Sequence, residues 1–430
     1  MSNIFFLRQK DYDVATILID DEGEIQGCRI KNSARVPFST SDNIRDIYKW
    51  WSDRAIPEGR DRLSLILNEY GCKNTKELLL KNLGLSLTDT YWICPEEYSY
   101  LTYDDVNLFD NGGEHIKFHE SEGRVHYTGT PNATVGGSLY KEAVKHDDGW
   151  YLEKGYNTKY PDSQQNINEV FISKLHEMQG WNEYVKYSTK LNDSNICERS
   201  SCKYFTSKSK ELISAVDLIG KLNKSESEKD ELDRYINLCV KGGLDEEYVR
   251  KSLDYMISMD YVTTNSDRHW GNFGIIRNPD TLKLMSVAPI FDNGNSMFFD
   301  APYMYNRTAL VRLENTGICK KEVDRLNLIH DRRILKTDLL PSPAEVKDFY
   351  CEYGIREDRA EQIAASYSNK LDLFMEYQHG LQISFAREMD VYIHGTPFIK
   401  QKPNPQYFKE HRDELTKEIK RLLLTSILID

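Results

Sequence analysis

The sequence predicts an α+β fold, in which a strand-containing first half precedes a mainly helical second half. Up to Thr206 the chain alternates short β-favouring runs with turns rich in Gly, Asn and Asp. After Thr206, apolar residues recur with helical periodicity over long stretches. The length of 430 residues, of which 40% are hydrophobic, is enough for two or three packed units with sizeable cores.

Composition excludes several classes of protein. The formal charge of −12, from 56 Lys and Arg against 68 Asp and Glu, argues against holding DNA by bulk charge. No run approaches the roughly 18 to 20 apolar residues that a membrane-spanning helix needs. The start, MSNIFFLRQK, is too short and too soon charged for a secretory signal. We therefore expect a cytoplasmic protein that neither enters a membrane nor binds nucleic acid by itself.

The eight cysteines are scattered, unlike those of a small disulfide scaffold, and they fit a reducing compartment. The nearest spacing, Cys197 to Cys202, has no matching His or Cys cluster. We interpret both as strand residues, with metal binding as the less favoured alternative.

The N-terminal part begins with a predicted hairpin. The runs 14–19 and 25–30 flank the turn DDEGE, whose charged residues and Gly suit a tight reversal. Residues 50–63 and the segment through Leu85 are predicted to be mostly helical. A turn-rich stretch follows at 128–138.

The middle of the chain is predicted to form strands around one helix. Strands at about 138–144 and 150–154 are joined by HDDG, and further strands lie within 184–205. Between them, residues 166–179 place apolar side chains on one side at helical periodicity. Beyond Thr206 we predict helices at 209–220, 228–241, 245–263 and over most of 343–428.

The change of character near 206, together with one near 125, predicts three domains. Residues 1–125 would form an N-terminal subdomain, 126–206 a small strand-containing lobe and 207–430 a larger helical lobe. No Pro-, Gly- or Ser-rich spacer marks the boundary near 206 as a flexible linker.

The most informative segment is DYVTTNSDRHWGNFGII, at 260–276. A predicted helix ends there in a polar loop that contains Asp267 and, five residues later, Asn272. The apolar run 273–276 can pair with 282–287 across the turn RNPDT. Such a hairpin would bring Asp292, of the run Phe-Asp-Asn-Gly, back beside Asn272.

Phosphoryl transfer needs this set of groups. One carboxylate can orient or deprotonate an acceptor hydroxyl, while an Asn carbonyl and a second carboxylate hold Mg²⁺, which prefers oxygen ligands. Protein kinases use Asp-x-x-x-x-Asn followed by Asp-Phe-Gly. Taken singly, each motif is a common loop or turn pattern, so their order along the chain carries the interpretation. Arg268 could orient carboxylates or be a satisfied loop charge. His269 could be a base or a ligand, but we expect it to be a packed, hydrogen-bonded scaffold residue.

Upstream residues supply candidates for the phosphate-binding parts. Gly136 and Gly137 precede a strand and could let the backbone approach phosphates, although a plain hairpin turn is an equal alternative. Alternation along 150–154 puts Lys154 on one face with Trp150 and Leu152, which is unusual for a solvated charge. The alternative is a lysine at the strand end whose ammonium reaches outward to solvent. Glu169 lies off the apolar stripe of the following helix, so it either pairs with Lys154 or faces solvent.

With these residues, the chain resembles the HipA family of bacterial serine/threonine kinases, whose fold is related to protein kinases and to phosphatidylinositol 3- and 4-kinases. Residues 50–63 are similar to the family's segment around Leu-Pro-Glu-Gly, here Ile-Pro-Glu-Gly. TPNATVGGSLYK followed by WYLEKG resembles the glycine-rich loop and the ATP-contacting lysine strand. NSDRHWGNFGII resembles the catalytic loop, and APIFDNGNSMF the metal-binding segment. Beyond 300 the resemblance is diffuse.

The resemblance implies a two-lobed, protein-kinase-like fold with ATP and Mg²⁺ as cofactors and a protein Ser/Thr hydroxyl as acceptor. It also implies that 1–125 is a HipA-type N-terminal subdomain, 126–206 the nucleotide-binding lobe and 207–430 the catalytic lobe. Asp267 would be the catalytic residue, and Asn272 and Asp292 would bind the metal. The ATP-binding residues would be Gly136, Gly137, Ser138, Lys154 and Glu169.

The resemblance also implies that the chain could phosphorylate its own glycine-rich loop, at Ser138 or at its rival Thr134. It further implies a toxin with an antitoxin partner, although the TPN-type loop differs from that of the founding toxin. Two alternatives stay open. The Asp-Arg-His-x-x-Asn order recurs in lipid kinases, so a lipid or small-molecule kinase is one. A kinase-shaped regulatory binding module is the other.

Overall fold

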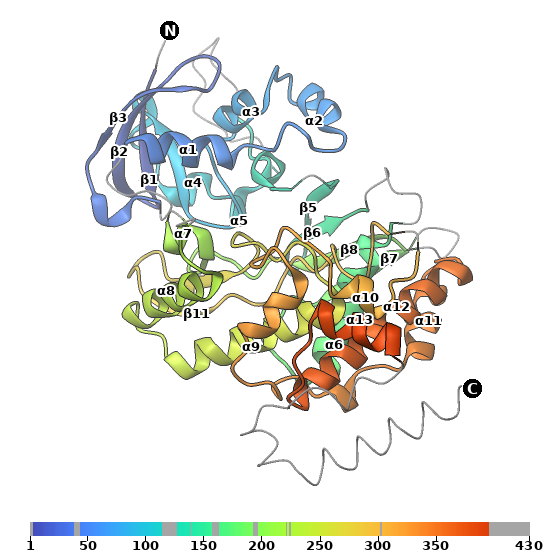
Figure 1. Cartoon of the computed structure of the whole chain (residues 1–430). Coiled ribbons are helices and arrows are strands. Elements are labelled where there is room, and N and C mark those ends of the chain that lie inside the picture. The colour runs from blue at the N-terminus through green and yellow to red at the C-terminus, as the bar shows by residue number, and fades with distance from the viewer. Residues whose placement is uncertain are drawn as a thin grey trace. The chain divides into compact units, whose positions relative to one another are not determined.

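The computed structural model describes residues 3–37, 44–113, 127–137, 139–156, 163–191, 197–220, 222, 225–301 and 303–394 (Figure 1). The chain divides into two compact units. The first comprises Met1–Ser173, Glu183–Val249 and Trp270–Asp292, and the second comprises Lys174–Asn182, Arg250–His269 and Asn293–Asp430. The predicted three-part division near 125 and 206 stays a prediction.

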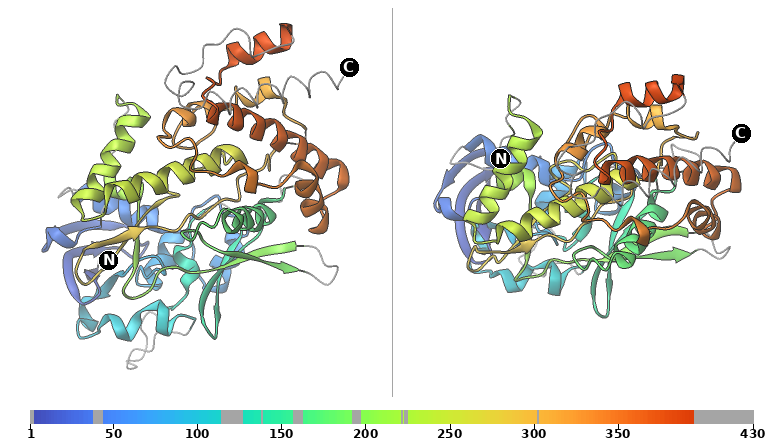
Figure 2. Two further views of the ribbon diagram at one scale, coloured as in Figure 1. Left: turned by 90° about the horizontal axis from the view of Figure 1, so that it is seen from below. Right: turned by 60° about the horizontal axis from the view of Figure 1, so that its bottom comes forward.

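The first unit begins with a four-stranded antiparallel sheet, drawn in blue in Figures 1 and 2. Its order is β3-β2-β1-β4, and the strands are β1 (Asn3–Gln9), β2 (Tyr12–Ile19), β3 (Ile25–Ile30) and β4 (Tyr91–Pro95). Alternate apolar side chains of these strands, such as Leu7, Ile17 and Ile93, are buried in one core. The predicted hairpin of 14–19 with 25–30 is confirmed as β2 and β3.

Helices follow the third strand, with bounds that differ from the prediction. They are α1 (Ile44–Arg54), α2 (Leu63–Glu69), α3 (Thr75–Lys81), α4 (Tyr103–Val106) and α5 (Leu108–Asn111). The prediction that residues 50–63 are mostly helical is wrong, because α1 ends at Arg54 and α2 begins only at Leu63. Pro57 explains the break, since a proline disfavours helical backbone in the residue before it and cannot donate a helical hydrogen bond.

A second sheet has the order β5-β6-β8-β7, with every neighbouring pair antiparallel. Its strands are β5 (Lys141–His146), β6 (Gly149–Lys154), β7 (Tyr187–Leu191) and β8 (Cys197–Lys203). Helix α6 (Gln165–Met178) lies between β6 and β7 in the sequence, as predicted. Cys197 and Cys202 are buried free thiols on β8, which confirms their interpretation as strand residues.

A third sheet, of order β11-β10-β9, replaces part of a predicted helix. Its strands are β9 (Glu211–Ser214), β10 (Gly274–Arg277) and β11 (Leu284–Val287). The predicted hairpin of 273–276 with 282–287 is confirmed as β10 and β11. The predicted helix over 209–220 is wrong up to Ser214, because these residues pair with β10, and only α7 (Ala215–Ile219) is helical. Gly274 permits this pairing, since a Cβ there would lie 2.1 Å from the Ile213 carbonyl oxygen.

The remaining helices agree with the predicted helical second half. They are α8 (Glu228–Lys241), α9 (Glu246–Thr263), α10 (Arg307–Leu310), α11 (Pro343–Glu352), α12 (Glu357–Gln378) and α13 (Phe385–His394). Capping boxes at Ser227 and Ser342 start α8 and α11, because each serine and the acidic residue three positions later satisfy backbone N–H groups reciprocally. The rest of the predicted helix to 428 lies outside the described residues.

Short 3₁₀ helices complete the elements, at Ser33–Arg35, Glu96–Tyr98, Pro131–Thr134, Glu322–Asn327 and Thr337–Leu339. No helix in the described ranges is long and apolar enough to cross a membrane. The mixture of antiparallel sheets and segregated helices confirms the predicted α+β class.

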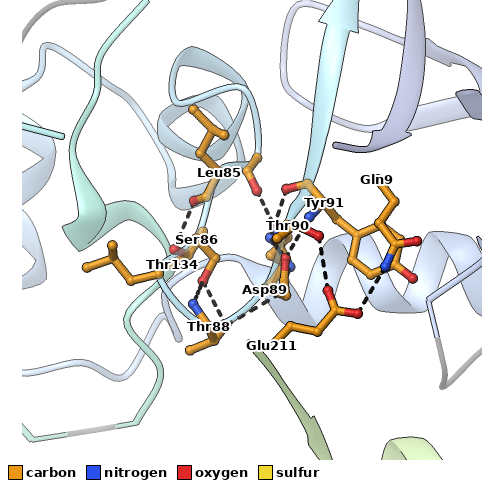
Figure 3. Close-up of polar contacts among 12 residues, drawn as sticks. Gln9, Leu85, Ser86, Thr88, Asp89, Thr90, Tyr91, Thr134 and Glu211 are labelled. Atoms are coloured by element: carbon orange, nitrogen blue, oxygen red, sulfur yellow. Dashed lines mark hydrogen bonds and ion pairs between the residues drawn. The ribbon is translucent and has the colours of Figure 1, made fainter. Parts of the chain in front are cut away.

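A buried carboxylate ties the first sheet to the third (Figure 3). Glu211, on β9, accepts hydrogen bonds from the Gln9 amide and the Thr90 hydroxyl, each 3.0 Å long. Arg277, on the neighbouring β10, forms an ion pair with the same carboxylate and donates a 3.1 Å hydrogen bond to Tyr91. A charge that is fully removed from water is tolerated only with such partners, so this cluster fixes how the two sheets meet.

We expect Glu211→Gln to lower the free energy of unfolding by about 3 to 5 kcal/mol, because it leaves the Arg277 guanidinium buried without its counter-charge. Urea unfolding followed by circular dichroism measures this change. The matched control is Asp53→Asn, which breaks an exposed ion pair with Lys49 and should cost under about 1 kcal/mol. Equal effects of the two substitutions would contradict the role given to the buried pair.

Candidate functional site

The centre of the candidate site in the first unit is the Lys154 ammonium. Lys154 is the last residue of β6, and its side chain is only 5% exposed. Nζ donates to Glu169 Oε1 at 2.6 Å and to Asp292 Oδ1 at 2.8 Å. The Tyr187 ring lies on another side, with its centroid 5.1 Å from Nζ. Lys154 is therefore not a strand-end lysine that reaches solvent.

Glu169 reaches Lys154 from helix α6. Of the two alternatives for this residue, the structure forms the ion pair, and the carboxylate is 2% exposed. Helix α6 is buried on all sides over 165–173, which is why a single apolar stripe did not locate its inner face. The exposed alternative for Glu169 is wrong.

Asp292 approaches Lys154 from the segment that follows β11. Its backbone has a φ of 58°, a left-handed conformation that Asp tolerates better than most residues with a side chain. The side chain is 30% exposed, so the carboxylate is partly accessible to solvent. The turn at Asp292 thus brings the carboxylate that follows the β10–β11 hairpin beside the Lys154 ammonium at the end of the β5–β6 hairpin.

The charges of this cluster determine the protonation of Lys154. Burial disfavours the ammonium, but the carboxylates of Asp292 and Glu169 outweigh burial and raise the pKa of Lys154 well above its usual value. Lys154 is therefore a fixed positive charge at neutral pH.

The glycine-rich loop lies before β5. Gly136 and Gly137 are exposed, and Gly137 has a φ of 93°, which glycine adopts without strain. Arg60 holds this loop, because its buried guanidinium donates to the carbonyls of Val135 and Lys141. Arg60 directly follows the Ile-Pro-Glu-Gly motif, so the N-terminal motif supports the loop. Ser138 lies outside the described residues.

Thr134, the rival of Ser138 for loop phosphorylation, has its hydroxyl engaged. Oγ1 donates to the Leu85 carbonyl at 3.0 Å (Figure 3), and the residue is half-buried. A phosphoryl group could reach this oxygen only after that hydrogen bond breaks.

Asp267 belongs to the second unit, where it follows α9 in a polar loop. Its Oδ2 accepts a 3.0 Å hydrogen bond from the Asn295 amide, and its Oδ1 accepts a 2.8 Å hydrogen bond from the Thr316 hydroxyl. The Asp267 backbone N–H donates to the Asn265 side chain at 3.1 Å. Two side chains from separate segments thus fix the carboxylate, and one of them is a hydroxyl.

Arg268 and His269 differ from each other. Arg268 is buried and pairs with Asp260 of α9 at 2.8 Å, while its Nη2 donates to Asn293 Oδ1 at 2.6 Å. Arg268 is therefore a loop charge satisfied by its partners, and it also orients a carboxylate, that of Asp260. Both predicted interpretations of Arg268 apply. His269 is exposed, so its predicted packing is wrong.

Asn272 and Asp292 provide the oxygen types that Mg²⁺ prefers. Asn272 is buried, and the rings of its neighbours in the sequence, Trp270 and Phe273, pack with centroids 5.4 Å apart. The Ala288 N–H donates to the Gly274 carbonyl, which extends the hairpin pairing toward Asp292. Within the described part of the chain, no three or more His, Cys, Asp or Glu side chains gather as metal ligands. The Asn272 and Asp292 metal site stays a prediction.

Sequence reasoning missed four residues of these surroundings: Arg60, Lys141, Asn295 and Thr316. Lys141 had a usable signal. The two-residue turn between β5 and β6 pairs Lys141 with Lys154 across the hairpin, and counting back from the HDDG turn predicts that register. Asn295 and Thr316 had none, because their contact with Asp267 joins segments distant in the sequence.

A strand lysine paired with a glutamate of the next helix, and with an aspartate after a later hairpin, is the arrangement of a protein-kinase-like fold. Two solved structures are similar. A Helicobacter pylori proinflammatory kinase, CtkA, is 15% identical with a TM-score of 0.41, over 57% of this chain and 92% of that chain. HipA, in a Shewanella oneidensis MR-1 toxin–antitoxin complex with HipB and operator DNA, is 11% identical with a TM-score of 0.43, over 87% and 90%.

No protein-family model matches the chain, and no curated protein matches it in sequence. Because the structural likenesses have low identities and TM-scores, function has to be argued from the site.

We expect Lys154→Met to lower the free energy of unfolding by about 3 to 5 kcal/mol, because Glu169 then keeps a buried charge without its counter-ion. Lys154→Met combined with Glu169→Leu should recover part of that loss, since both charges are removed together. Asp292→Asn should cost less than Lys154→Met, because water reaches that carboxylate. Denaturant titration of the four proteins checks this order, and a fully stable Lys154→Met variant would contradict the buried ion pair.

Proposed function

We propose that this protein is an ATP- and Mg²⁺-dependent kinase that transfers the γ-phosphoryl group of ATP to a Ser or Thr hydroxyl of a protein. The observation that carries the proposal is the buried Lys154 ammonium held between Glu169 and Asp292. Kinases need such a lysine, paired with a helix glutamate and near a metal-binding aspartate, to hold the phosphates of ATP.

Lys154 would contact the nucleotide phosphates, with Glu169 holding its ammonium in place. Asn272 and Asp292 would hold Mg²⁺, which neutralises charge on the phosphates when bound. The acidic balance of the chain, −12, makes such local positive charge necessary, because the overall field repels a nucleotide.

Asp267 would orient the acceptor hydroxyl and accept its proton. The oxygen of that hydroxyl forms a bond to the γ-phosphorus. At the same time the bond between the γ-phosphorus and the oxygen that bridges the β- and γ-phosphates breaks, and ADP leaves with that oxygen. The contact from Thr316 supports this role, because a hydroxyl already donates to Asp267 Oδ1 at 2.8 Å. Asp267 and Asn272 are five residues apart, which is the spacing of the kinase catalytic loop and supports giving them these two roles.

A lipid or small-molecule acceptor is the second candidate, since the same loop order serves both classes. The toxin role and the antitoxin partner also stay predictions, because no surface of the described residues bears on them.

We expect Asp267→Asn to lower phosphoryl transfer by about 10²- to 10⁴-fold, because the acceptor loses the group that takes its proton. Purified protein is incubated with labelled ATP, Mg²⁺ and either a cell lysate or an inositide panel, and intact mass reports autophosphorylation. Asp348→Asn, an exposed helix position, is the matched control. Labelling of the inositides without any labelled protein would favour the second candidate. Equal labelling by wild type and Asp267→Asn, or none by either, would overturn the proposal.

We expect Thr316→Val to lower kcat by about tenfold with little change in the KM for ATP, since Asp267 loses one hydrogen bond to its charged carboxylate. Thr316→Ser keeps the hydroxyl and should keep the activity. A steady-state comparison of the three proteins tests this. An inactive Thr316→Ser variant, or a fully active Thr316→Val variant, would show that the hydroxyl does not position Asp267.

A further inference from the structure

We propose that Lys141 is a second phosphate-binding lysine, which holds the nucleotide phosphates together with Lys154. The inference rests on the proposed kinase function and gives a role to the last residue of the TPNATVGGSLYK segment, which the sequence analysis left without one. Lys141 is the first residue of β5 and lies directly opposite Lys154 in the antiparallel pairing of β5 with β6. Side chains of directly paired residues point to the same face of a sheet, so the side chains of Lys141 and Lys154 are neighbours on one face.

The Lys141 ammonium lacks the partners that Lys154 has. Its side chain is 11% exposed, and its nearest carboxylate oxygen, Asp292 Oδ1, is 4.0 Å away. That distance is too long for a hydrogen bond, and Asp292 already accepts one from Lys154 at 2.8 Å. Among the described residues, no side chain or carbonyl accepts a hydrogen bond from Lys141 Nζ. An ammonium this far removed from water is stabilised when an anion binds to it.

The glycine-rich loop passes close to this ammonium. A Cβ at Gly137 would lie 2.7 Å from Lys141 Nζ, so only a glycine lets the backbone run there without displacing the lysine. An anion that binds against the loop backbone is therefore within reach of Lys141.

The charges around Lys141 leave a local positive surplus. Arg60 is buried, and its described partners are the carbonyl oxygens of Val135 and Lys141, which carry no full charge. The charges that act on Lys141 are thus the cations Lys154 and Arg60 and the carboxylates Asp292 and Glu169. With Lys141 itself, three positive charges stand against two negative ones. Burial, offset only in part by Asp292, lowers the pKa of Lys141, as expected for an ammonium without enough counter-charge.

Like charges placed opposite each other in a sheet destabilise it, so a purely structural role does not explain this pair. Phosphate oxygens would supply both the negative charge and the hydrogen-bond acceptors that Lys141 lacks. The ligand chemistry is that of a polyphosphate, and in the proposed reaction it is the phosphate chain of ATP.

Equilibrium binding of ATP and of adenosine to Lys141→Met tests the inference. We expect at least a tenfold loss of affinity for ATP, unchanged affinity for adenosine and an unchanged or higher melting temperature. Lys141→Arg should retain most of the ATP affinity. Lys283→Met, which removes the same charge from an exposed position of the first unit, is the matched control and should bind ATP like wild type.

Three outcomes would overturn the role of Lys141: wild-type affinity for ATP in Lys141→Met, an equal loss for ATP and adenosine, or an equal loss in Lys283→Met. If wild type binds no ATP, the proposed kinase function fails, and inorganic tripolyphosphate then tests the anion site directly. Tripolyphosphate binding that depends on Lys141 would support the site, and binding that does not, or no binding, would overturn it.

Discussion

The first unit depends on the burial of one charge, the Lys154 ammonium. Water cannot stabilise an ammonium that is 5% exposed, so carboxylates must do so. They come from helix α6, 15 residues along the chain, and from the segment after β11, 138 residues along. The sheet that carries Lys154, the helix after it and the hairpin of β10 and β11 can therefore be arranged in few other ways without leaving a buried charge unpaired.

The same constraint holds irregular backbone in place elsewhere. Asp292 and Thr264 have left-handed backbones, at φ of 58° and 55°, in segments where no regular ladder fixes the chain. In the first unit, the ion pair with Lys154 holds Asp292 in this conformation. In the second, the pair of Arg268 with Asp260 anchors the loop that carries Asp267. Buried ion pairs add little stability compared with apolar packing, but they permit few alternative arrangements, which suits a site whose groups must be positioned within fractions of an ångström.

Prediction from the sequence succeeded where local signals were strong. The hairpins β2–β3 and β10–β11 follow turns that favour reversal, and α6 follows helical periodicity. It failed where a distant partner decided the outcome. Residues 211–214 are a strand because β10 pairs with them. For Glu169 the sequence left two alternatives open, and the fold decided for the ion pair with Lys154 because α6 is buried there. His269 is exposed although its neighbour Arg268 is buried, which a one-dimensional pattern cannot show.

The sequence by itself determined which chemical groups are available and in what order: a lysine on a strand, a glutamate on the next helix, and Asp267, Asn272 and Asp292 around a hairpin. Only the tertiary structure decided which of them carry buried charges and which partners hold them. The physical reason is that burial and ion pairing depend on segments far apart in the chain. Lys141 illustrates this, because its lysine is visible in the sequence, whereas its missing acceptors and its place beside Gly137 and Lys154 appear only once the chain is folded.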